Sequence, residues 1–415
     1  MSGETLLQSS ESPSADSVIH CPVCGGGFLR VFWEMTELPV FCNVLCATRA
    51  EALSIPRGDI RLAVCSACSY IRNVSFDPSL MKYNAAYENT LRHSPTFRDY
   101  ADQLVRRLVD TFDLRNKTVL EIACGDGDFL KRLCQAGGNR GIGFDPSYSP
   151  TATPNPNGSI EIIADYYSEK YEHIHADLIC CRHALEHIPD PVTFLRTIRQ
   201  SLGERTMAVF FEVPNVLFTL RDLGVWDILY EHCSYFSAAS LAECFHRSGF
   251  RVNRVEETYG GQFLTLDAKT SRLPQEAQAT PQGSSRADRW DPQFVVALAE
   301  RFREGFTAKL AAWSSRLEAM RLAGHRPVLW GSGTKGVMFL NMLGAAGVAH
   351  GIEYAVDINP KKQGKFVAGA GMPIVDPSFL QSSRPGCVIA MNPHYVEEIR
   401  AQLAGMNITA PVLAA

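Results

Sequence analysis

The stretch Val119–Leu130, with the sequence VLEIACGDGDFL, decides how we expect this 415-residue chain to fold. It begins with the apolar run Val119–Ile122, which is typical of a buried parallel strand. The turn Gly125–Asp128 follows, in which two residues lack side chains, and Phe129 opens a helical pattern. A glycine turn between a strand and a helix lets a ligand approach bare backbone near a helix N-terminus. The sequence therefore predicts a ligand site at this turn.

Two carboxylates accompany the turn. Glu121 lies at the end of the first strand, and Asp145 follows a second apolar run, Gly141–Phe144. A carboxylate in the place of Asp145 can accept both hydroxyls of a ribose. The nicotinamide fingerprint G-x-G-x-x-G is not completed, because Leu130 occupies its third glycine position. The order Glu-x-x-x-Gly-x-Gly and then a strand-end aspartate resembles motifs one and two of class I S-adenosylmethionine (SAM)-dependent methyltransferases; a turn without a ligand is the alternative.

Residues 86–268 continue the alternation of strands and helices that is typical of a doubly wound sheet. The strand Ile160–Ile163 leads to Asp165 and Tyr166, where a carboxylate can accept the adenine amino group and a ring can lie against the base. The later segment 182–191, RHALEHIPDP, is similar to the segment after the fourth strand of class I methyltransferases. The residues expected to hold the cofactor are Glu121, Cys124, Gly125, Gly127, Phe129, Asp145, Pro146, Asp165, Tyr166 and His183.

Two C-x-x-C pairs precede this domain. They are Cys21 with Cys24 and, forty residues further on, Cys65 with Cys68. Each pair can place two thiolates on one side of a tight turn, and together they complete a tetrahedral zinc site of a structural kind. The alternative is four buried cysteines without a metal. We expect a zinc domain over residues 20–85 after a disordered tail, residues 1–19.

The segment 226–237, WDILYEHCSYFS, concentrates groups suited to proton transfer. His232 is flanked by the carboxylate of Glu231 and close to Tyr230, and a histidine oriented by a carboxylate is suited to general-base work. A histidine satisfied in a structural hydrogen-bond network is the alternative. Tyr83 and Tyr87 precede the cofactor domain and can cover its site or belong to the core.

A Pro-, Ser- and Gln-rich linker is expected at residues 269–291, followed by a third domain at 292–415. This domain opens with an amphipathic helix of about residues 292–322 and contains the complete G-x-G-x-x-G turn Gly331–Gly336, with a strand ending in Asp357. The basic loop 359–365 faces phosphates or is a solvated surface run.

Composition limits the remaining possibilities. The formal net charge is −4, which gives no basic footprint for nucleic acid. No run of eighteen apolar residues and no signal-peptide core occurs, so we expect a soluble, cytoplasmic protein with no membrane partner. Thirteen cysteines in that compartment are expected to be reduced or metal-bound.

The motif order resembles the three-domain sugar C-methyltransferases, which methylate nucleotide-linked 4-keto-sugars. The motifs that carry the resemblance are the two C-x-x-C pairs, LPVFCN, EIACGDG, HALEHIP, YEHCSYFS, ETYGGQFL, GSGTKG and VDINPKKQGK. The resemblance implies an α/β class I SAM methyltransferase fold with a small N-terminal zinc domain and a C-terminal Rossmann-like domain that helps hold a nucleotide sugar. It implies site roles for Glu231, His232, His187 and Tyr87, and a monomer or homodimer. Leu229 departs from the family, which has a tyrosine there; here Tyr230 lies next to Glu231.

The resulting hypothesis is C-methylation of a small-molecule acceptor. His232, oriented by Glu231, removes a proton next to a ketone, and Tyr87, Tyr230 or His187 hydrogen-bonds the developing enolate oxygen. Three alternatives remain: an O- or N-methyltransferase, an NAD-dependent oxidoreductase that uses the turn at Gly331–Gly336, and a binding module without catalysis.

Overall fold

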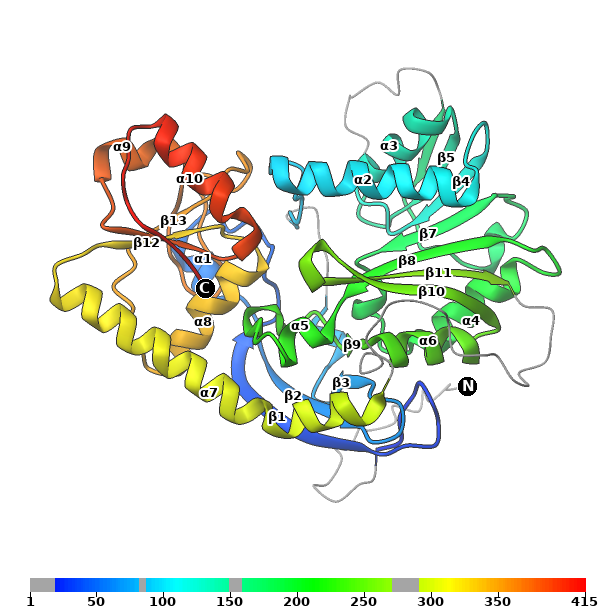
Figure 1. Ribbon diagram of the computed structural model, residues 1–415, viewed down its shortest axis with the longest axis horizontal. Helices are drawn as coiled ribbons and strands as arrows, with labels where there is room; N and C mark the ends of the chain where they lie inside the picture. Colours follow the sequence, from blue (N-terminus) through cyan, green and yellow to red (C-terminus); the bar gives the residue numbers. More distant parts are fainter. Residues whose placement is uncertain (1–18, 82–86, 149–158, 271–290) are drawn as a thin grey trace, which may run out of the picture.

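The computed structural model describes residues 19–81, 87–148, 159–270 and 291–415. Within these ranges the chain forms three sheets, and Figure 1 shows one on the left (strands within residues 327–414), one on the right (strands within residues 118–270, without 234–235) and one below, between the other two (residues 29–73 with 234–235). Nearly all of the predicted N-terminal tail, Tyr83 and most of the predicted linker lie outside the described residues.

The N-terminal sheet is antiparallel and takes one strand from far along the chain. Its strands, in spatial order, are β1 (Leu29–Pro39), β2 (Arg57–Cys65), β3 (Ile71–Asn73) and β9 (Ser234–Tyr235). The short helices α1 (Arg49–Leu53) and η1 (Pro78–Leu80) lie in its connections. Because β9 directly follows the Glu231-His232 pair, this sheet holds the segment in which the sequence predicts the chemistry.

The central sheet is mainly parallel. Its order is β10 (Phe250–Thr258), β11 (Phe263–Thr270), β8 (Ala208–Pro214), β7 (Leu178–Arg182), β4 (Thr118–Ile122), β5 (Arg140–Phe144) and β6 (Ile160–Ile163). The chain first moves outward from β4 to β6 and then returns to β7 on the other side of β4. The strand order therefore reverses between β4 and β7, and a ligand crevice is expected outside the carboxyl ends of these strands. The predicted hairpin closing this domain is confirmed as β10 and β11.

Helices cover both faces of the central sheet. They are α2 (Pro95–Phe112), α3 (Asp128–Gly137), α4 (Pro191–Ser201) and α6 (Ala238–Arg247), whereas the short helix α5 (Val216–Leu220) belongs to an apolar core shared with the N-terminal sheet. Their starts follow from capping: Ser94 caps α2, Asp190 caps α4 and Ser237 caps α6, each accepting a backbone N–H with its side chain. Proline at the first position of α2 and α4 suits a helix N-terminus, where no intrahelical donor is lost.

The C-terminal sheet is parallel throughout. Its order is β14 (Ile374–Val375), β13 (Ala355–Val356), β12 (Pro327–Trp330), β15 (Cys387–Ala390) and β16 (Val412–Ala414). The helices of this part are α7 (Pro292–Leu322), α8 (Thr334–Ala345), α9 (Leu380–Ser383) and α10 (Val396–Gly405). A parallel sheet with a glycine turn between β12 and α8 is the expected Rossmann-like arrangement.

Helix α7 joins the N-terminal and C-terminal sheets, as Figure 1 shows along the lower edge of the molecule. In its first half, the ring centroid of Phe306 lies 5.0 Å from that of Trp33 in β1. In its second half, the ring centroid of Trp313 lies 5.3 Å from that of Phe339 in α8. One apolar core includes residues of β1, β2, α5, α7 and α8. The domains are therefore packed on shared apolar surface.

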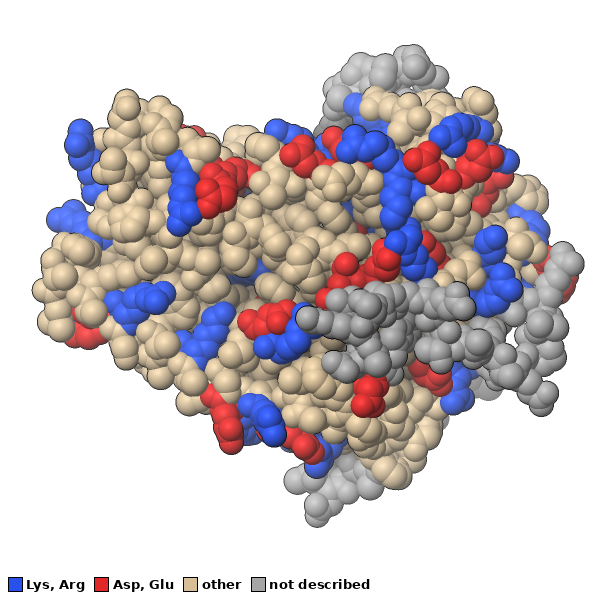
Figure 2. All heavy atoms as spheres, in the orientation of Figure 1, with Lys and Arg blue, Asp and Glu red and all other residues tan. Residues whose placement is uncertain are grey.

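Two surface properties bear on function. No helix in the described ranges has both the length and the apolar character needed to cross a bilayer. Acidic and basic side chains are interspersed on the face that Figure 2 shows.

Candidate active site

The turn after β4 opens the predicted cofactor site. Ala123, Gly125 and Gly127 have positive φ values of 57°, 57° and 78°, which bend the chain sharply from the strand into α3. A Cβ atom on Gly127 would lie 2.7 Å from Ile162 Cδ1, whereas a Cβ atom on Gly125 would meet no atom within 4 Å. The second glycine is thus required by packing, and the backbone at the first is open to a ligand.

Asp145 fixes this turn to the end of β5. Its Oδ2 accepts a hydrogen bond from Gly125 N at 2.8 Å, and its Oδ1 accepts from Ser147 N at 2.9 Å and Ser147 Oγ at 2.6 Å. Pro146 lies between these two residues. The structure therefore brings Asp145 beside the glycine turn, as the ribose prediction requires.

Asp165 and Tyr166 lie at the same edge of the sheet, after β6. Asp165 forms an ion pair with Lys170 and accepts from Tyr171 Oη at 2.6 Å, and these side-chain hydrogen bonds lower the pKa of its carboxyl to about 2. Tyr166 is 71% exposed, so its ring is available to a planar ligand. The adenine contacts stay a prediction.

Glu121 is buried under the turn with one oxygen unused. It is 3% exposed, and its Oε2 has no hydrogen-bond partner among the described residues. Burial raises the pKa of this carboxyl to about 8 and also raises the pKa of Cys124. An oxygen in this state suits a ligand N–H or ammonium group.

A layer of paired charges lies at the ends of β7 and β8. Arg182 Nη2 is 2.8 Å from Glu212 Oε1, and His183 Nε2 is 2.7 Å from the same oxygen. Tyr100 donates to the other oxygen of Glu212, and the Arg182 guanidinium lies 4.0 Å from the centroid of Phe129. Burial alone would raise the pKa of Glu212, but the charge of Arg182 overrides it and lowers the pKa to about 2. His183 and Phe129 therefore adjoin this layer, and their contact with the cofactor stays a prediction.

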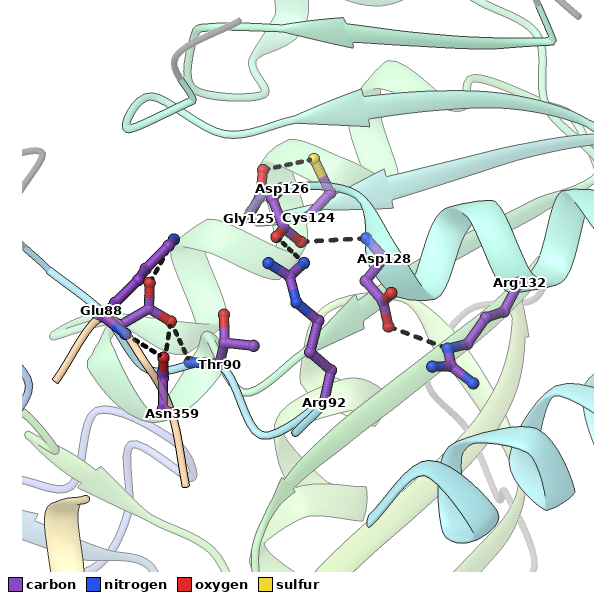
Figure 3. Close-up of polar contacts among 10 residues, drawn as sticks. Glu88, Thr90, Arg92, Cys124, Gly125, Asp126, Asp128, Arg132 and Asn359 are labelled. Atoms are coloured by element: carbon purple, nitrogen blue, oxygen red, sulfur yellow. Dashed lines mark hydrogen bonds and ion pairs between the residues drawn. The ribbon is translucent and has the colours of Figure 1, made fainter. Parts of the chain in front are cut away.

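A polypeptide segment before α2 joins the turn to the C-terminal domain. Arg92 forms an ion pair with Asp126 of the turn, and Glu88 contacts Asn359 Nδ2 at 3.3 Å (Figure 3). Lys361 Nζ also donates to Glu88 at 2.6 Å. Burial alone would raise the pKa of the Glu88 carboxyl, but the hydrogen bond from Lys361 lowers it. The segment thus connects both predicted ligand sites.

Glu231 is held by the N-terminal domain. Its Oε2 accepts from Cys42 N at 3.0 Å, and its carboxylate is hydrogen-bonded by the side chain of Tyr87. Its Oε1 is buried without a partner among the described residues, and burial raises the pKa of the carboxyl to about 7. The structure therefore places Tyr87 against Glu231, although the two residues are far apart in sequence, and this contact was not predicted.

The side chain of Tyr230 points into the N-terminal domain. Its hydroxyl accepts from Asp77 N at 2.8 Å, its ring lies 5.5 Å from that of Phe76, and it is 1% exposed. It packs into the N-terminal domain beside Gly58, where a Cβ atom would lie 2.3 Å from the Tyr230 ring. These contacts give Tyr230 a packing role, and we leave it out of the proposed chemistry.

His187 and His232 face each other beyond the ends of the strands. Their ring centroids are 4.9 Å apart at an interplanar angle of 84°, and His232 Nε2 lies 4.0 Å from Glu186 Oε1. His187 belongs to η3 (Leu185–His187), and its ring hydrogen-bonds the backbone carbonyl of Glu231. Burial lowers the pKa of His187 to about 4, lowers that of His232 and raises that of Glu186 to about 8. Both imidazoles are therefore neutral near pH 7.

The four predicted metal-binding cysteines converge and are all buried. Cys21 Sγ lies 3.6 Å from Cys68 Sγ, and Cys24 Sγ lies 3.6 Å from Cys65 Sγ. Bonds of about 2.3 Å to a tetrahedral zinc ion place the sulfur atoms about 3.8 Å apart, so the cluster fits such an ion closely. Cys42 and Cys46 are buried elsewhere in the apolar core.

The C-terminal glycine turn lies between β12 and α8 and is covered by neighbouring segments. Asn43 Nδ2 donates to Thr334 Oγ1 at 3.0 Å, and Lys335 Nζ lies 2.6 Å from Asp227 Oδ1. Lys362 is 6% exposed and donates to Ser332 O at 3.3 Å. No carboxylate of a described residue lies within ion-pair distance of the Lys362 ammonium group. A small cavity at this junction is lined by residues that include Asn43, Ser332, Lys362 and Lys365.

Three parts of this site were not predicted from the sequence. Glu186 was visible only as one letter of the HALEHIP motif, and nothing in the pattern indicated that it faces both histidines. The signal for Arg182 and Glu212 is a charged residue at the end of an otherwise apolar strand. The backbone of Cys42, which donates to Glu231, left no signal in the sequence.

Known families match two parts of the chain. Residues 91–255 match a family described as a methyltransferase domain, and residues 284–410 match a family described as a C-methyltransferase C-terminal domain. Together with the strand order and the glycine turn after β4, these matches define the class: the chain is a SAM-dependent methyltransferase whose central domain has the class I fold, and its last domain matches the C-terminal domain of C-methyltransferases. The second match includes the turn Gly331–Gly336, so this turn is part of that domain.

Individual relatives agree with the class. The C-methyltransferase NovU of Streptomyces niveus is 28% identical over 323 residues, which cover 72% of this chain and 72% of the relative. The ubiquinone biosynthesis O-methyltransferase of Neisseria meningitidis serogroup C is 27% identical over 114 residues, 25% of this chain and 46% of the relative. Among solved structures, the magnesium protoporphyrin IX methyltransferase (ChlM) of Synechocystis PCC 6803 with bound SAH aligns at a TM-score of 0.34 and 18% identity, covering 42% of this chain and 84% of that one.

Proposed function

We propose that this chain methylates a carbon atom next to a carbonyl group of a nucleotide-linked keto-sugar or a related small-molecule acceptor. The observation that carries the proposal is the pair of half-buried, neutral imidazoles, His187 and His232, facing each other at the carboxyl end of the central sheet. The C-methyltransferase C-terminal domain and the similarity to C-methyltransferase NovU support transfer to carbon.

The cofactor is proposed to lie across the turn after β4. Glu121 would accept from the ammonium group, the open backbone at Gly125 would face the amino-acid part, and Asp145 would accept the ribose hydroxyls. Asp165 and Tyr166 would hold the adenine. Bound SAM supplies an electrophilic methyl group.

The base is proposed to be His232. It is neutral, so its lone pair is free to take the proton from the acceptor carbon while the electrons of the C–H bond pass to the carbonyl oxygen. Tyr87 would donate a hydrogen bond to the resulting enolate oxygen, because the single N–H of neutral His187 already bonds the carbonyl of Glu231. Because the carboxylate of Glu231 contacts Cys42 N and Tyr87 in the structure, we assign it to positioning Tyr87.

The acceptor's phosphates are proposed to bind at the C-terminal turn. A buried lysine ammonium without a carboxylate partner is costly unless an anion joins it. Lys362 is in this state beside the N-terminal end of α8, where backbone N–H groups and the helix dipole also favour an anion. This combination favours a diphosphate-linked acceptor over an uncharged one.

The test is a mass-shift and NMR assay of the wild type and of His232→Asn with labelled SAM and candidate nucleotide-linked keto-sugars. We expect a methyl group on carbon in the wild type, and a loss of turnover of about 10²- to 10⁴-fold in the variant. SAH affinity of the variant should be unchanged, which shows that the cofactor site is intact. Near-normal turnover in the variant would refute the base assignment, and a methyl group on oxygen would refute C-methylation.

A further inference from the structure

Glu186 has no role in the proposed methyl transfer, yet it lies against both histidines. One ligand atom each from Glu186, His187 and His232 lies within 4.8 Å of the other two. Glu186 and His187 come from η3, after β7, whereas His232 precedes β9. Two separate segments thus bring two imidazoles and a carboxylate to one point.

The side chains are already oriented in the manner of metal ligands. The ring of His187 bonds the carbonyl of Glu231 with one nitrogen, and in metal sites this kind of contact fixes the ring so that its other nitrogen faces the ion. Glu186 is 2% exposed, and its Oε2 has no partner among the described residues. His232 Nδ1 is likewise buried without a partner there.

No lysine or arginine of the described residues forms an ion pair with Glu186. Arg182, which ends β7, is paired with Glu212 and lies outside the group. A carboxyl group buried between two neutral imidazoles is unsatisfied unless a proton or a cation joins it. A divalent cation satisfies the carboxylate and both nitrogen lone pairs at once.

We propose that Glu186, His187 and His232 bind a divalent cation of the zinc type, and that filling this site blocks the acceptor base. Two nitrogen donors and one oxygen donor suit zinc, cobalt or nickel better than magnesium or calcium. Bonds of about 2.0–2.1 Å place donor atoms about 3.3 Å apart, so the 4.0 Å between His232 Nε2 and Glu186 Oε1 must shorten by about 0.7 Å on binding. The bound ion takes the lone pair with which His232 would accept the proton.

Binding of the cation stands independently of the proposed function, whereas inhibition rests on it. The cation site can therefore be tested by an experiment that does not measure turnover. Protein with its four-cysteine site loaded, as verified by metal analysis, is titrated with Zn²⁺ against a chromogenic chelator. We expect one further zinc equivalent in the wild type and in Glu169→Gln, a change of an exposed glutamate in the same domain.

Glu186→Gln and His187→Gln should each lower the affinity for this further equivalent at least about 10- to 100-fold, the range seen even when only an outer partner of a metal ligand is lost. SAH binding by both variants shows that they are folded. No further zinc equivalent in the wild type, or equal affinity in both folded variants, would overturn the proposal.

The second arm measures methyl transfer as Zn²⁺ is raised. We expect inhibition that a chelator reverses, and a shift of the inhibition curve to higher zinc concentration in any variant that retains turnover. Zinc binding without inhibition in an active enzyme would overturn the blocking step. Zinc binding by a protein that methylates none of the keto-sugars would count against the proposed function alone, and methylation without a further zinc equivalent would count against the cation site alone.

Discussion

The chain contains two glycine turns of the same design with opposite surroundings. After β4, Asp145 accepts from Gly125 N at 2.8 Å; after β12, Asp357 accepts from Ser332 N at 2.9 Å. Each aspartate follows the next strand and anchors its turn in the same way. The similarity of the two turns therefore does not decide what each one binds.

The charges around the turns differ. Four acidic groups surround the first turn, namely Glu121, Asp126, Asp128 and Asp145. Arg92 pairs with Asp126 and Arg132 pairs with Asp128, so Asp145 and the Glu121 Oε2 that has no partner among the described residues are the groups that favour the cationic sulfonium and ammonium groups of SAM. Lys362 covers the second, with Nζ 3.8 Å from the position of a Cβ atom on Gly333, and this favours phosphate. The comparison indicates that the residues packed on a glycine turn, rather than the turn itself, select the ligand.

The largest expected effect comes from the metal cluster, because the N-terminal domain supplies Asn43 to the second turn and Cys42 to Glu231. Structural zinc is worth about 10–16 kcal/mol of apparent binding free energy in small zinc domains. Cys65→Ser should therefore lose the metal, lower the Tm and abolish turnover, with a smaller loss of SAH affinity. Cys46→Ser, in the same domain but outside the cluster, should keep its zinc. Metal analysis measures the zinc content of both variants, and calorimetry measures their Tm. Full zinc content in Cys65→Ser would contradict the assignment of the four cysteines as zinc ligands.

Replacement of the two turn aspartates, Asp145 and Asp357, should affect SAH affinity differently. Asp145→Ala removes charged hydrogen bonds worth about 1.5–3 kcal/mol each, so SAH affinity should fall about 10- to 150-fold. Asp357→Ala should leave SAH affinity within about 3-fold, since every contact it loses lies at the other turn. Isothermal titration of both variants with SAH makes the measurement. Equal losses of SAH affinity in the two variants would contradict the distinction between the two turns.

Replacement of the turn glycines, Gly127 and Gly333, should have a smaller effect, which is measured on the free energy of unfolding. Gly127 has a φ of 78° and a Cβ atom there would lie 2.7 Å from Ile162 Cδ1, so Gly127→Ala should cost about 1–3 kcal/mol of unfolding free energy. Gly333 has a φ of −76°, which any residue adopts, so Gly333→Ala should change unfolding by less than about 0.5 kcal/mol. Its added methyl group should instead weaken nucleoside diphosphate binding. Denaturant unfolding of both variants tests this, and the reverse order of stability would be evidence against the described turn geometry.

The smallest effect is expected at the ion pairs that flank the turns. Arg92 and Asp126 are 36% and 48% exposed, so Asp126→Asn should cost no more than about 1 kcal/mol, less at high salt. Lys335 and Asp227 are 20% and 18% exposed, so Asp227→Asn should cost more and depend less on salt. Unfolding at low and high salt concentration compares them; an equal response to salt would show that the second turn is no better shielded than the first.

The local elements of this fold could be predicted from the sequence. The strand at Val119–Ile122, helix α2 after Ser94 and the hairpin β10–β11 follow from apolar runs, caps and turns, and each is present. Motif order also indicated the three-part architecture. These features are encoded within a few neighbouring residues, which is why pattern reading finds them.

Contacts between distant segments could not be predicted in this way. The bond from Cys42 N to Glu231 joins residues 189 positions apart, and the pairing of β3 with β9 inserts a piece of the central segment into the N-terminal sheet. Tyr230 was expected in the site because it adjoins Glu231, but successive residues point in different directions, and its hydroxyl contacts Asp77 instead. Adjacency in sequence is therefore a poor guide to convergence in space.

The most direct test of the account is isothermal titration of the wild type with SAH and with a nucleoside diphosphate, each in the absence and presence of saturating amounts of the other, and the same with Lys362→Met. The account predicts two sites that are filled together, with the diphosphate affinity alone reduced in the variant. Mutual exclusion of the two ligands, or a loss of SAH affinity in Lys362→Met with the diphosphate unaffected, would contradict it.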